Sequence, residues 1–114
     1  MATKTTAINY SKRFLNACKE LPIKIDRAIL FGSVARGKAT SDSDIDLALF
    51  SDSFSNNILK NIDLLGKVLI HYPELDVHTF PSHSQKKGSM MEDEIKQTGI
   101  AIKVCDYSAA KLAK

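Results

Sequence analysis

The chain has 114 residues, of which 44% are hydrophobic and 25% charged, and its formal net charge at pH 7 is +3. This length is enough for the core of one small domain, but not for a catalytic domain together with a separate substrate domain. So small a charge excess does not by itself indicate a nucleic-acid partner, and no direct contact with nucleic acid is expected. We expect residues 1–105 to form the single domain and residues 106–114 a C-terminal tail.

Two cysteines, Cys18 and Cys105, lie far apart in the chain without a CxxC pattern or a neighbouring histidine at ligand spacing. Neither a structural zinc site nor a disulfide framework is indicated, and both cysteines are expected to be reduced core residues. The first 14 residues lack the apolar run of a signal peptide, and no run in the chain reaches the length of a membrane span. The expected location is therefore the cytoplasm.

The first third of the chain predicts a helix, a strand and a short helix. Residues 5–20 place their apolar side chains at helical spacing, and Pro22 follows the last of them. Residues 24–32 are too continuously apolar for a surface element, which is typical of a buried strand that Gly32 ends. Residues 33–39 leave room for a helix of two turns at most.

The remainder continues the alternation of strands and helices. Residues 44–50 alternate apolar and acidic side chains as a strand does, residues 58–69 repeat apolar side chains at helical spacing, and residues 74–80 predict a third strand. A last helix is expected to begin at residues 92–94, and residues 100–104 predict a fourth strand. This order indicates an α/β (α+β) domain with a small mixed β-sheet of about four strands backed by helices.

Three aspartates suggest a metal site. Asp44 and Asp46 alternate on one predicted strand, so both side chains leave the same face about 6 to 7 Å apart along the chain. Such anions repel one another unless a cation lies between them, and Mg²⁺ is the cation that prefers a few carboxylate oxygens completed by water and phosphate. If the strand of Asp76 neighbours this one, three carboxylates meet, which is enough to hold two ions.

The Gly-Ser turn before this strand predicts a phosphate-binding site. Gly32 lets the backbone come close to a ligand, and Ser33 offers a hydroxyl and an amide. Arg36 has two interpretations that the sequence does not separate, since it can contact the same phosphates or pair with an aspartate. His78 shares the Asp76 face of a regular strand, but a single histidine near a carboxylate is more often a surface or packing residue, so it is not assigned to the site.

The motifs form one pattern, which consists of Gly32-Ser33, residues 35–37, residues 43–47 with their two aspartates, and Asp76 on a later strand. This pattern resembles the minimal nucleotidyltransferases (MNT) of the DNA polymerase beta superfamily. The resemblance covers essentially the whole chain. It implies a polymerase beta palm-like fold, in which Gly32 and Ser33 hold the nucleotide's phosphates and Asp44, Asp46 and Asp76 bind two Mg²⁺ ions and act in catalysis.

The same resemblance implies a reaction and a partner. A hydroxyl attacks the α-phosphorus of a nucleoside triphosphate, with ATP as the expected donor, and pyrophosphate leaves. Members of this size commonly pair with a helical HEPN-type protein, so the resemblance implies an antitoxin that transfers AMP to a tyrosine of its toxin. Two alternatives stay open: a catalytically silent module that binds nucleotide and partner, and a small-molecule nucleotidyltransferase whose acceptor site is on another chain. The sequence does not decide between homo- and hetero-oligomers.

Overall fold

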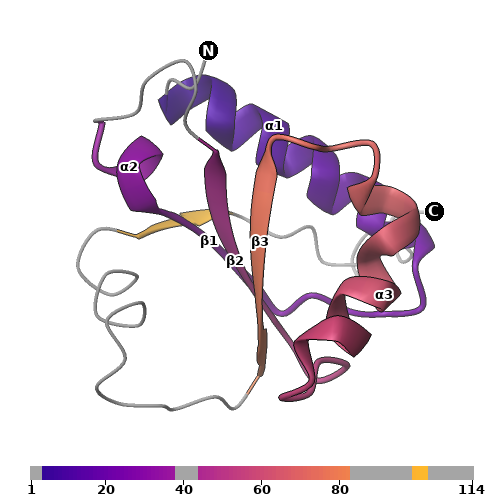
Figure 1. The fold of residues 1–114 in the computed structure, drawn as a ribbon. Coiled ribbons are helices and arrows are strands. Elements are labelled where there is room, and N and C mark those ends of the chain that lie inside the picture. Colours follow the sequence, from indigo (N-terminus) through magenta and orange to yellow (C-terminus); the bar gives the residue numbers. More distant parts are fainter. Residues whose placement is uncertain (1–3, 38–43, 83–98, 103–114) are drawn as a thin grey trace, which may run out of the picture.

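The computed structural model describes residues 4–37, 44–82 and 99–102. The expected alternation of helices and strands is confirmed in these ranges (Figure 1). The predicted helix from residues 92–94 and the tail 106–114 lie outside them. No helix in the described ranges is long and apolar enough to cross a membrane. The elements are α1 (Lys4–Ala17), the 3₁₀ turn η1 (Cys18–Glu20), β1 (Arg27–Phe31), α2 (Gly32–Ala35), β2 (Ile45–Ser51), α3 (Ile58–Leu69), β3 (Leu75–Pro81) and β4 (Ile100–Ile102).

The four strands form one mixed sheet in the order β3-β2-β1-β4. β1 runs antiparallel to both β2 and β4, whereas β2 and β3 are parallel. A parallel pair needs a long crossover connection, and α3 supplies it. Asn57 caps the start of α3 by accepting a hydrogen bond from the backbone N–H of Lys60 at 3.2 Å. The sequence prediction of a small mixed sheet with helices is therefore confirmed.

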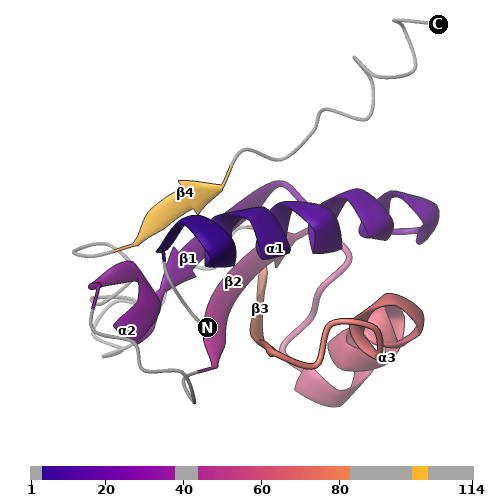
Figure 2. The same cartoon turned by 90° about the horizontal axis from the view of Figure 1, so that it is seen from above.

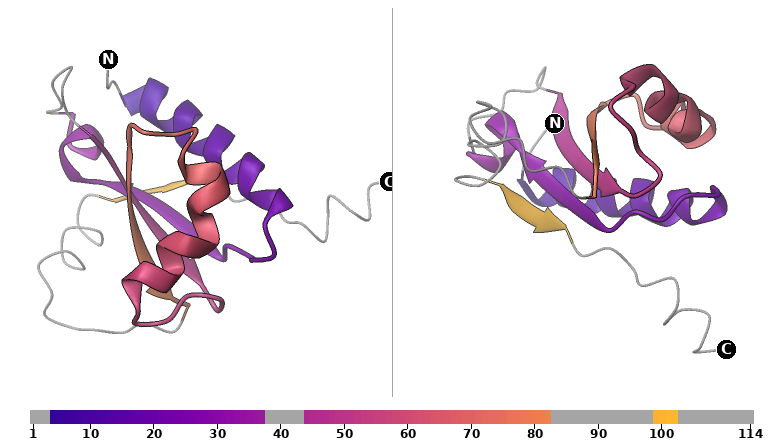
Figure 3. Two further views of the ribbon diagram at one scale, coloured as in Figure 1. Left: turned by 45° about the vertical axis from the view of Figure 1, so that its right-hand side comes forward. Right: turned by 90° about the horizontal axis from the view of Figure 1, so that it is seen from below.

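The main core lies between one face of the sheet and helices α1 and α3. Leu47 and Leu49 of β2 point into it together with Phe14 of α1 and Leu65 of α3, and all four side chains are buried. α1 contacts α2 and β4 as well as α3, and α3 lies close to β3 (Figures 2 and 3). Most of the apolar area that stabilises the domain is thus removed from water on this one side.

The opposite face of the sheet carries a second, aromatic cluster. Phe50 and Phe80 stack with their ring centroids 5.0 Å apart, and the guanidinium of Arg27 lies 4.2 Å from the Phe50 centroid. Phe31 and Ala48 are buried in the same cluster. Because residues of β1 are buried or half-buried on both faces of the sheet, its apolar residues run on without the alternation of a half-exposed strand.

One buried polar side chain, Asn61, joins three segments. Its amide nitrogen donates to the carbonyl of Ser55 at 2.8 Å and to the hydroxyl of Thr79 at 2.9 Å. Its amide oxygen accepts from the backbone N–H of Ser55 at 2.9 Å. With these bonds made, the burial of Asn61 carries little penalty, and α3 is fixed against β3 and against the loop that follows β2.

We expect the thiol of Cys18 to be protected in the folded protein. Burial raises its pKa to about 12, and the reactive form is the thiolate. In a Cys105→Ser variant at pH 8, a thiol reagent should leave the folded protein unmodified and label Cys18 once urea unfolds it. Above pH 9 the unfolded chain loses this proton first, so the free energy of unfolding should fall as pH rises. Equal labelling rates with and without urea would contradict the burial of Cys18.

Candidate active site

The bend after β1 is built around Gly32. Its φ is +78°, a conformation that L side chains rarely adopt, and a Cβ at this position would collide with the carboxylate of Asp46 and lie 3.1 Å from its Cγ. The backbone carbonyl of Gly32 accepts a hydrogen bond from the N–H of Arg36 at 3.1 Å, which closes the short helix α2. Glycine is therefore needed twice, for the bend itself and for the close approach of its backbone to Asp46.

The parallel pairing of β2 and β3 brings two carboxylates together. Asp46 lies directly opposite Asp76 in the register, near the beginning of both strands. The start of β2 lies beside α2 (Figure 1). Nε2 of His78 lies 3.4 Å from Oδ1 of Asp46 and 3.5 Å from Oδ2 of Asp76. In the part of the chain that the structure describes, Asp46, Asp76 and His78 form the group of possible ligands whose atoms all lie within 4.8 Å of one another. We call these three residues the acid-histidine cluster.

The surroundings of Asp46 make its ionised form unfavourable. Burial raises the pKa of this carboxyl, the contact with His78 lowers it, and the neighbouring Asp76 raises it again, with a net shift upward. The side chain is 27% exposed, against 54% for Asp76. A cation placed between the two carboxylates would lower the pKa of Asp46 instead, since an opposite charge favours the ionised form.

The structure gathers some of the residues predicted from sequence and leaves others apart. Gly32, Asp46 and Asp76 come together as expected. Asp44 is exposed just before β2 and lies outside the acid-histidine cluster, so its role as a ligand stays a prediction. Ser33 is half-buried and Arg36 is exposed, and their roles toward phosphate also stay predictions.

His78 belongs to the cluster, although the sequence interpretation left it out as a surface or packing residue. The sequence did indicate this position, because Asp76 lies two positions before His78 on β3 and both side chains therefore leave the same face of the strand. What the sequence lacked was the register that places Asp46 opposite Asp76 and within reach of His78. Its ring also packs edge-on against Phe31, with centroids 5.1 Å apart, so it is a packing residue and a cluster member at once.

The cluster suits a divalent cation chemically. Two carboxylates supply hard, negatively charged oxygens, and the half-exposed Asp76 leaves one side open for water or phosphate oxygens. The side chain that would obstruct the approach from β1 is missing, because residue 32 is glycine. The donors that Mg²⁺ requires are therefore present among the described residues.

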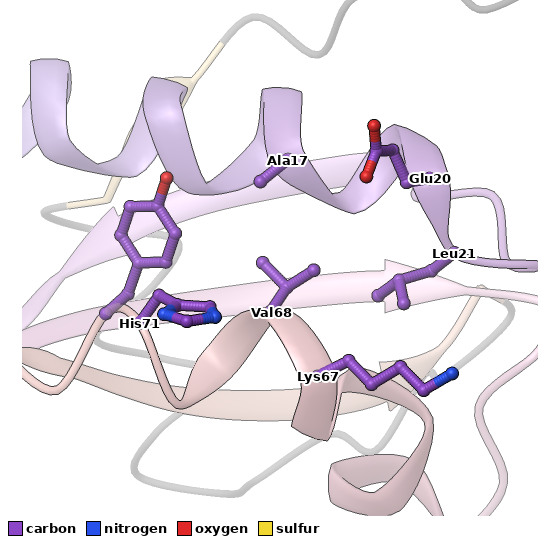
Figure 4. Close-up of a pocket in the computed structure, with 7 residues that line it drawn as sticks. Ala17, Glu20, Leu21, Lys67, Val68 and His71 are labelled. Atoms are coloured by element: carbon purple, nitrogen blue, oxygen red, sulfur yellow. The ribbon is translucent and has the colours of Figure 1, made fainter.

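A separate pocket of about 470 Å³ lies between the ends of α1 and α3 (Figure 4). It opens beside the helices, whereas the acid-histidine cluster projects from the other face of the sheet. None of the residues of that cluster contributes to it. The pocket is lined by Ala17, Glu20, Leu21, Lys67, Val68, His71 and Tyr72.

Substituting Gly32 and Gly37 by alanine should separate the backbone strain of a positive φ from the collision of a Cβ with Asp46. We expect Gly32→Ala to lower the free energy of unfolding by about 1–3 kcal/mol through its positive φ, and also to displace Asp46. Gly37 has a φ of +73° but open space around its Cβ position, so Gly37→Ala should show the strain alone. Urea unfolding and titration with Mn²⁺ measure the two effects separately.

Gly66 supplies the control for these variants. It lies inside α3 with no atom within 4 Å of a Cβ, so Gly66→Ala should stabilise the protein by about 0.5–1 kcal/mol. Cation binding that survives in Gly32→Ala as well as in Gly37→Ala would show that the close approach of Gly32 to Asp46 does not matter to the site.

Replacing Asp46 should stabilise the protein when no metal is bound. Because folding raises the pKa of Asp46, its ionised form disfavours the folded state above the unfolded pKa, and this penalty disappears at low pH where the carboxyl is protonated. In EDTA at pH 7, Asp46→Asn should raise Tm by a few degrees, and the gain should vanish on acidification. A Tm that falls at pH 7 would mean that the bond to His78 outweighs burial.

Comparison with known proteins identifies the family of the chain. Residues 11–102 match the family described as Nucleotidyltransferase domain. A curated relative named "Putative protein adenylyltransferase MJ0604", from Methanocaldococcus jannaschii, is 42% identical over 62 residues, which make up 54% of this chain and 59% of that protein. The chain thus matches less than two thirds of that relative's length.

Three solved structures share the fold. A "putative nucleotidyltransferase" from Sulfolobus solfataricus has a TM-score of 0.61 at 15% identity, covering 86% of this chain and 80% of its own. A toxin-antitoxin structure with AMP-PNP gives 0.58 at 22%, with 93% and 80% covered. The complex of a tri-AMPylated Shewanella oneidensis HEPN toxin with its MNT antitoxin gives 0.51 at 20%, with 97% and 81% covered. At these identities the likeness concerns the fold, and it is the family match over residues 11–102 that shows that the chain belongs to the nucleotidyltransferase domain family.

Proposed function

We propose that this domain is a Mg²⁺-dependent adenylyltransferase that moves AMP from ATP to a hydroxyl group of a partner protein. The observation that carries the proposal is the position of Asp46 opposite Asp76, directly against the Gly32 bend. Nucleotidyl transfer needs acidic ligands beside a backbone that phosphates can approach closely. The nucleotidyltransferase family and the name of the M. jannaschii relative support the same reaction class.

In this proposal each residue has a stated task. Gly32 and Ser33 bind the triphosphate through backbone amides and the Ser33 hydroxyl, and Arg36 contacts the same phosphates. Asp44, Asp46 and Asp76 hold two Mg²⁺ ions. Bound Mg²⁺ neutralises phosphate charge and polarises the α-phosphoryl group. The partial burial of Asp46 strengthens its attraction for a cation, because the charge is less screened there than at the surface.

The transfer itself balances as a simple displacement. The acceptor hydroxyl oxygen forms a bond to the α-phosphorus, the bond from that phosphorus to the bridging oxygen of the β-phosphate breaks, and pyrophosphate leaves. The hydroxyl proton passes to the carboxylate of Asp76, which is the more exposed acid of the cluster, and from there to water. Asp76 is therefore assigned a double role as ligand and as proton acceptor.

The acceptor that we propose is a tyrosine of a HEPN-type toxin, with this protein as the antitoxin. Support comes from the two fold relatives that are toxin-antitoxin structures, one of them with an AMPylated HEPN toxin. We place the reaction in the cytoplasm, where ATP and such a toxin would meet.

A second candidate is a module that binds nucleotide and partner without chemistry. It is favoured by one observation, since Asp44 lies outside the acid-histidine cluster and a two-ion site needs more than Asp46 and Asp76. A small-molecule acceptor held by another chain is the third candidate. Both differ from the first in what a mass measurement would find on the partner protein.

The test is a transfer assay read by intact mass. Purified protein, ATP and Mg²⁺ are incubated with the product of the neighbouring gene. We expect this partner to gain the mass of one or more AMP groups. Asp46→Asn and Asp44→Asn should reduce transfer to background while the circular dichroism spectrum stays that of the folded protein. His71→Gln, in the separate pocket, is the matched control and should transfer normally.

Three outcomes decide between the candidates. No adduct on the partner despite measurable ATP binding would favour the silent module. An adduct on a small molecule would favour the third candidate. Full transfer by Asp46→Asn would contradict the assigned role of the cluster.

A further inference from the structure

We propose that His78 is itself a metal ligand, and that the mixed set of two carboxylates and one imidazole gives this site a preference for Mn²⁺ over Mg²⁺. The inference rests on the proposed function, because it concerns the cation used there. It adds a nitrogen ligand to the site, whereas the proposed function assigns the cations to the carboxylates of Asp44, Asp46 and Asp76 alone. It predicts a larger preference for Mn²⁺ over Mg²⁺ than carboxylates alone would produce, because imidazole nitrogen binds transition-metal ions better than it binds Mg²⁺.

The geometry of the cluster already approaches that of a coordinated ion. Nε2 of His78 lies 3.4 Å from an oxygen of Asp46 and 3.5 Å from an oxygen of Asp76. With bonds of about 2.1 Å, adjacent ligands lie about 3.0 Å apart around an octahedral ion and about 3.4 Å apart around a tetrahedral one. Shifts of a few tenths of an ångström would thus bring Nε2 to coordination distance from each carboxylate oxygen. The three atoms lie within 4.8 Å of one another, so the two carboxylates would also move closer together to bind one cation.

The imidazole is held in this position by its surroundings. His78 follows Asp76 by two residues on a paired strand, so both side chains leave the same face of the sheet. Its ring packs edge-on against Phe31, which stands beside Asp46 in the β1–β2 register. A side chain that is 24% exposed and packed in this way has few other orientations to adopt, so the nitrogen is pre-positioned toward the two carboxylates.

The chemistry of the donors sets the preference. Mg²⁺ favours oxygen ligands and keeps several waters, whereas imidazole nitrogen is a ligand of choice for transition-metal ions. Mn²⁺ accepts both kinds of donor, and it can take the two carboxylate oxygens and Nε2 together. The competing explanation is that His78 only separates the two carboxylates in the absence of metal and moves aside when an ion binds.

Electron paramagnetic resonance with Mn²⁺ distinguishes these explanations without any activity measurement. Titration gives the fraction of bound Mn²⁺, and pulsed spectra report ¹⁴N nuclei bonded to the ion. We expect ¹⁴N coupling in the wild type and its loss in His78→Gln, with Mn²⁺ binding at least about tenfold weaker, since even loss of a group that only supports a ligand costs about 10–100-fold. His71→Gln and His83→Gln, which alter the other two histidines, should keep the signal.

A second variant tests the preference directly. His78→Asp restores an all-carboxylate set, so its ratio of Mn²⁺ to Mg²⁺ affinity should fall below that of the wild type in competition titrations. A ratio that is equal or higher would overturn the proposed preference. Melting curves in EDTA establish that each variant is folded before it is titrated.

The failure of this inference can be told apart from failure of the proposed function. Mn²⁺ that binds the wild type without ¹⁴N coupling, or with coupling that persists in His78→Gln, overturns the role of His78 and leaves the carboxylate site standing. A wild-type protein that binds no Mn²⁺ at all overturns both. Coupling that disappears only in His78→Gln supports the assignment.

Discussion

The candidate site depends on one unfavourable contact that the fold imposes. Two carboxylates lie directly opposite each other on neighbouring parallel strands. Like charges in this position weaken strand pairing, yet Asp46 and Asp76 occupy paired positions of β2 and β3. The remainder of the strand pair compensates through apolar neighbours, among them Leu47 beside Val77 and the stacked rings of Phe50 and Phe80. The domain thus tolerates repulsion at one end of a well-packed strand pair, where a cation can relieve it.

Stability and chemistry are divided between the two faces of the sheet. The residues of β2 that point toward α1 and α3 belong to the main core. The residues that alternate with them on β2 point to the other face and include Asp46 and members of the aromatic cluster. Changes at the site therefore do not remove contacts of the main core, which is why site variants of this protein can be expected to fold. The bonds of Asn61 to Ser55 and Thr79 tie the helical layer to β3 close to His78, so the two faces are not mechanically independent.

Local patterns predicted most of the fold, because helix spacing, strand alternation and the Gly-Ser bend are properties of short segments. The faces of β2 were predicted correctly, with Leu47 toward the core and Asp46 away from it. The pairing of β2 with β3 could only be assumed, since register is decided by contacts between distant segments. The sequence interpretation left His78 out because a single histidine near a carboxylate is more often a surface or packing residue. It made no prediction for Asn61, whose three bonds join α3 to the loop that follows β2 and to β3.

The parallel pair joined through α3 also limits how this chain can change in length. Side chains alternate between faces along a strand, so one residue added inside β3 ahead of Asp76 would turn that aspartate toward the helices and bring an apolar neighbour out in its place. The same addition in the exposed turn before α3 would leave the phase of both strands untouched. Natural variation in length should therefore accumulate in the connections, while the spacing from Leu75 to His78 stays constant.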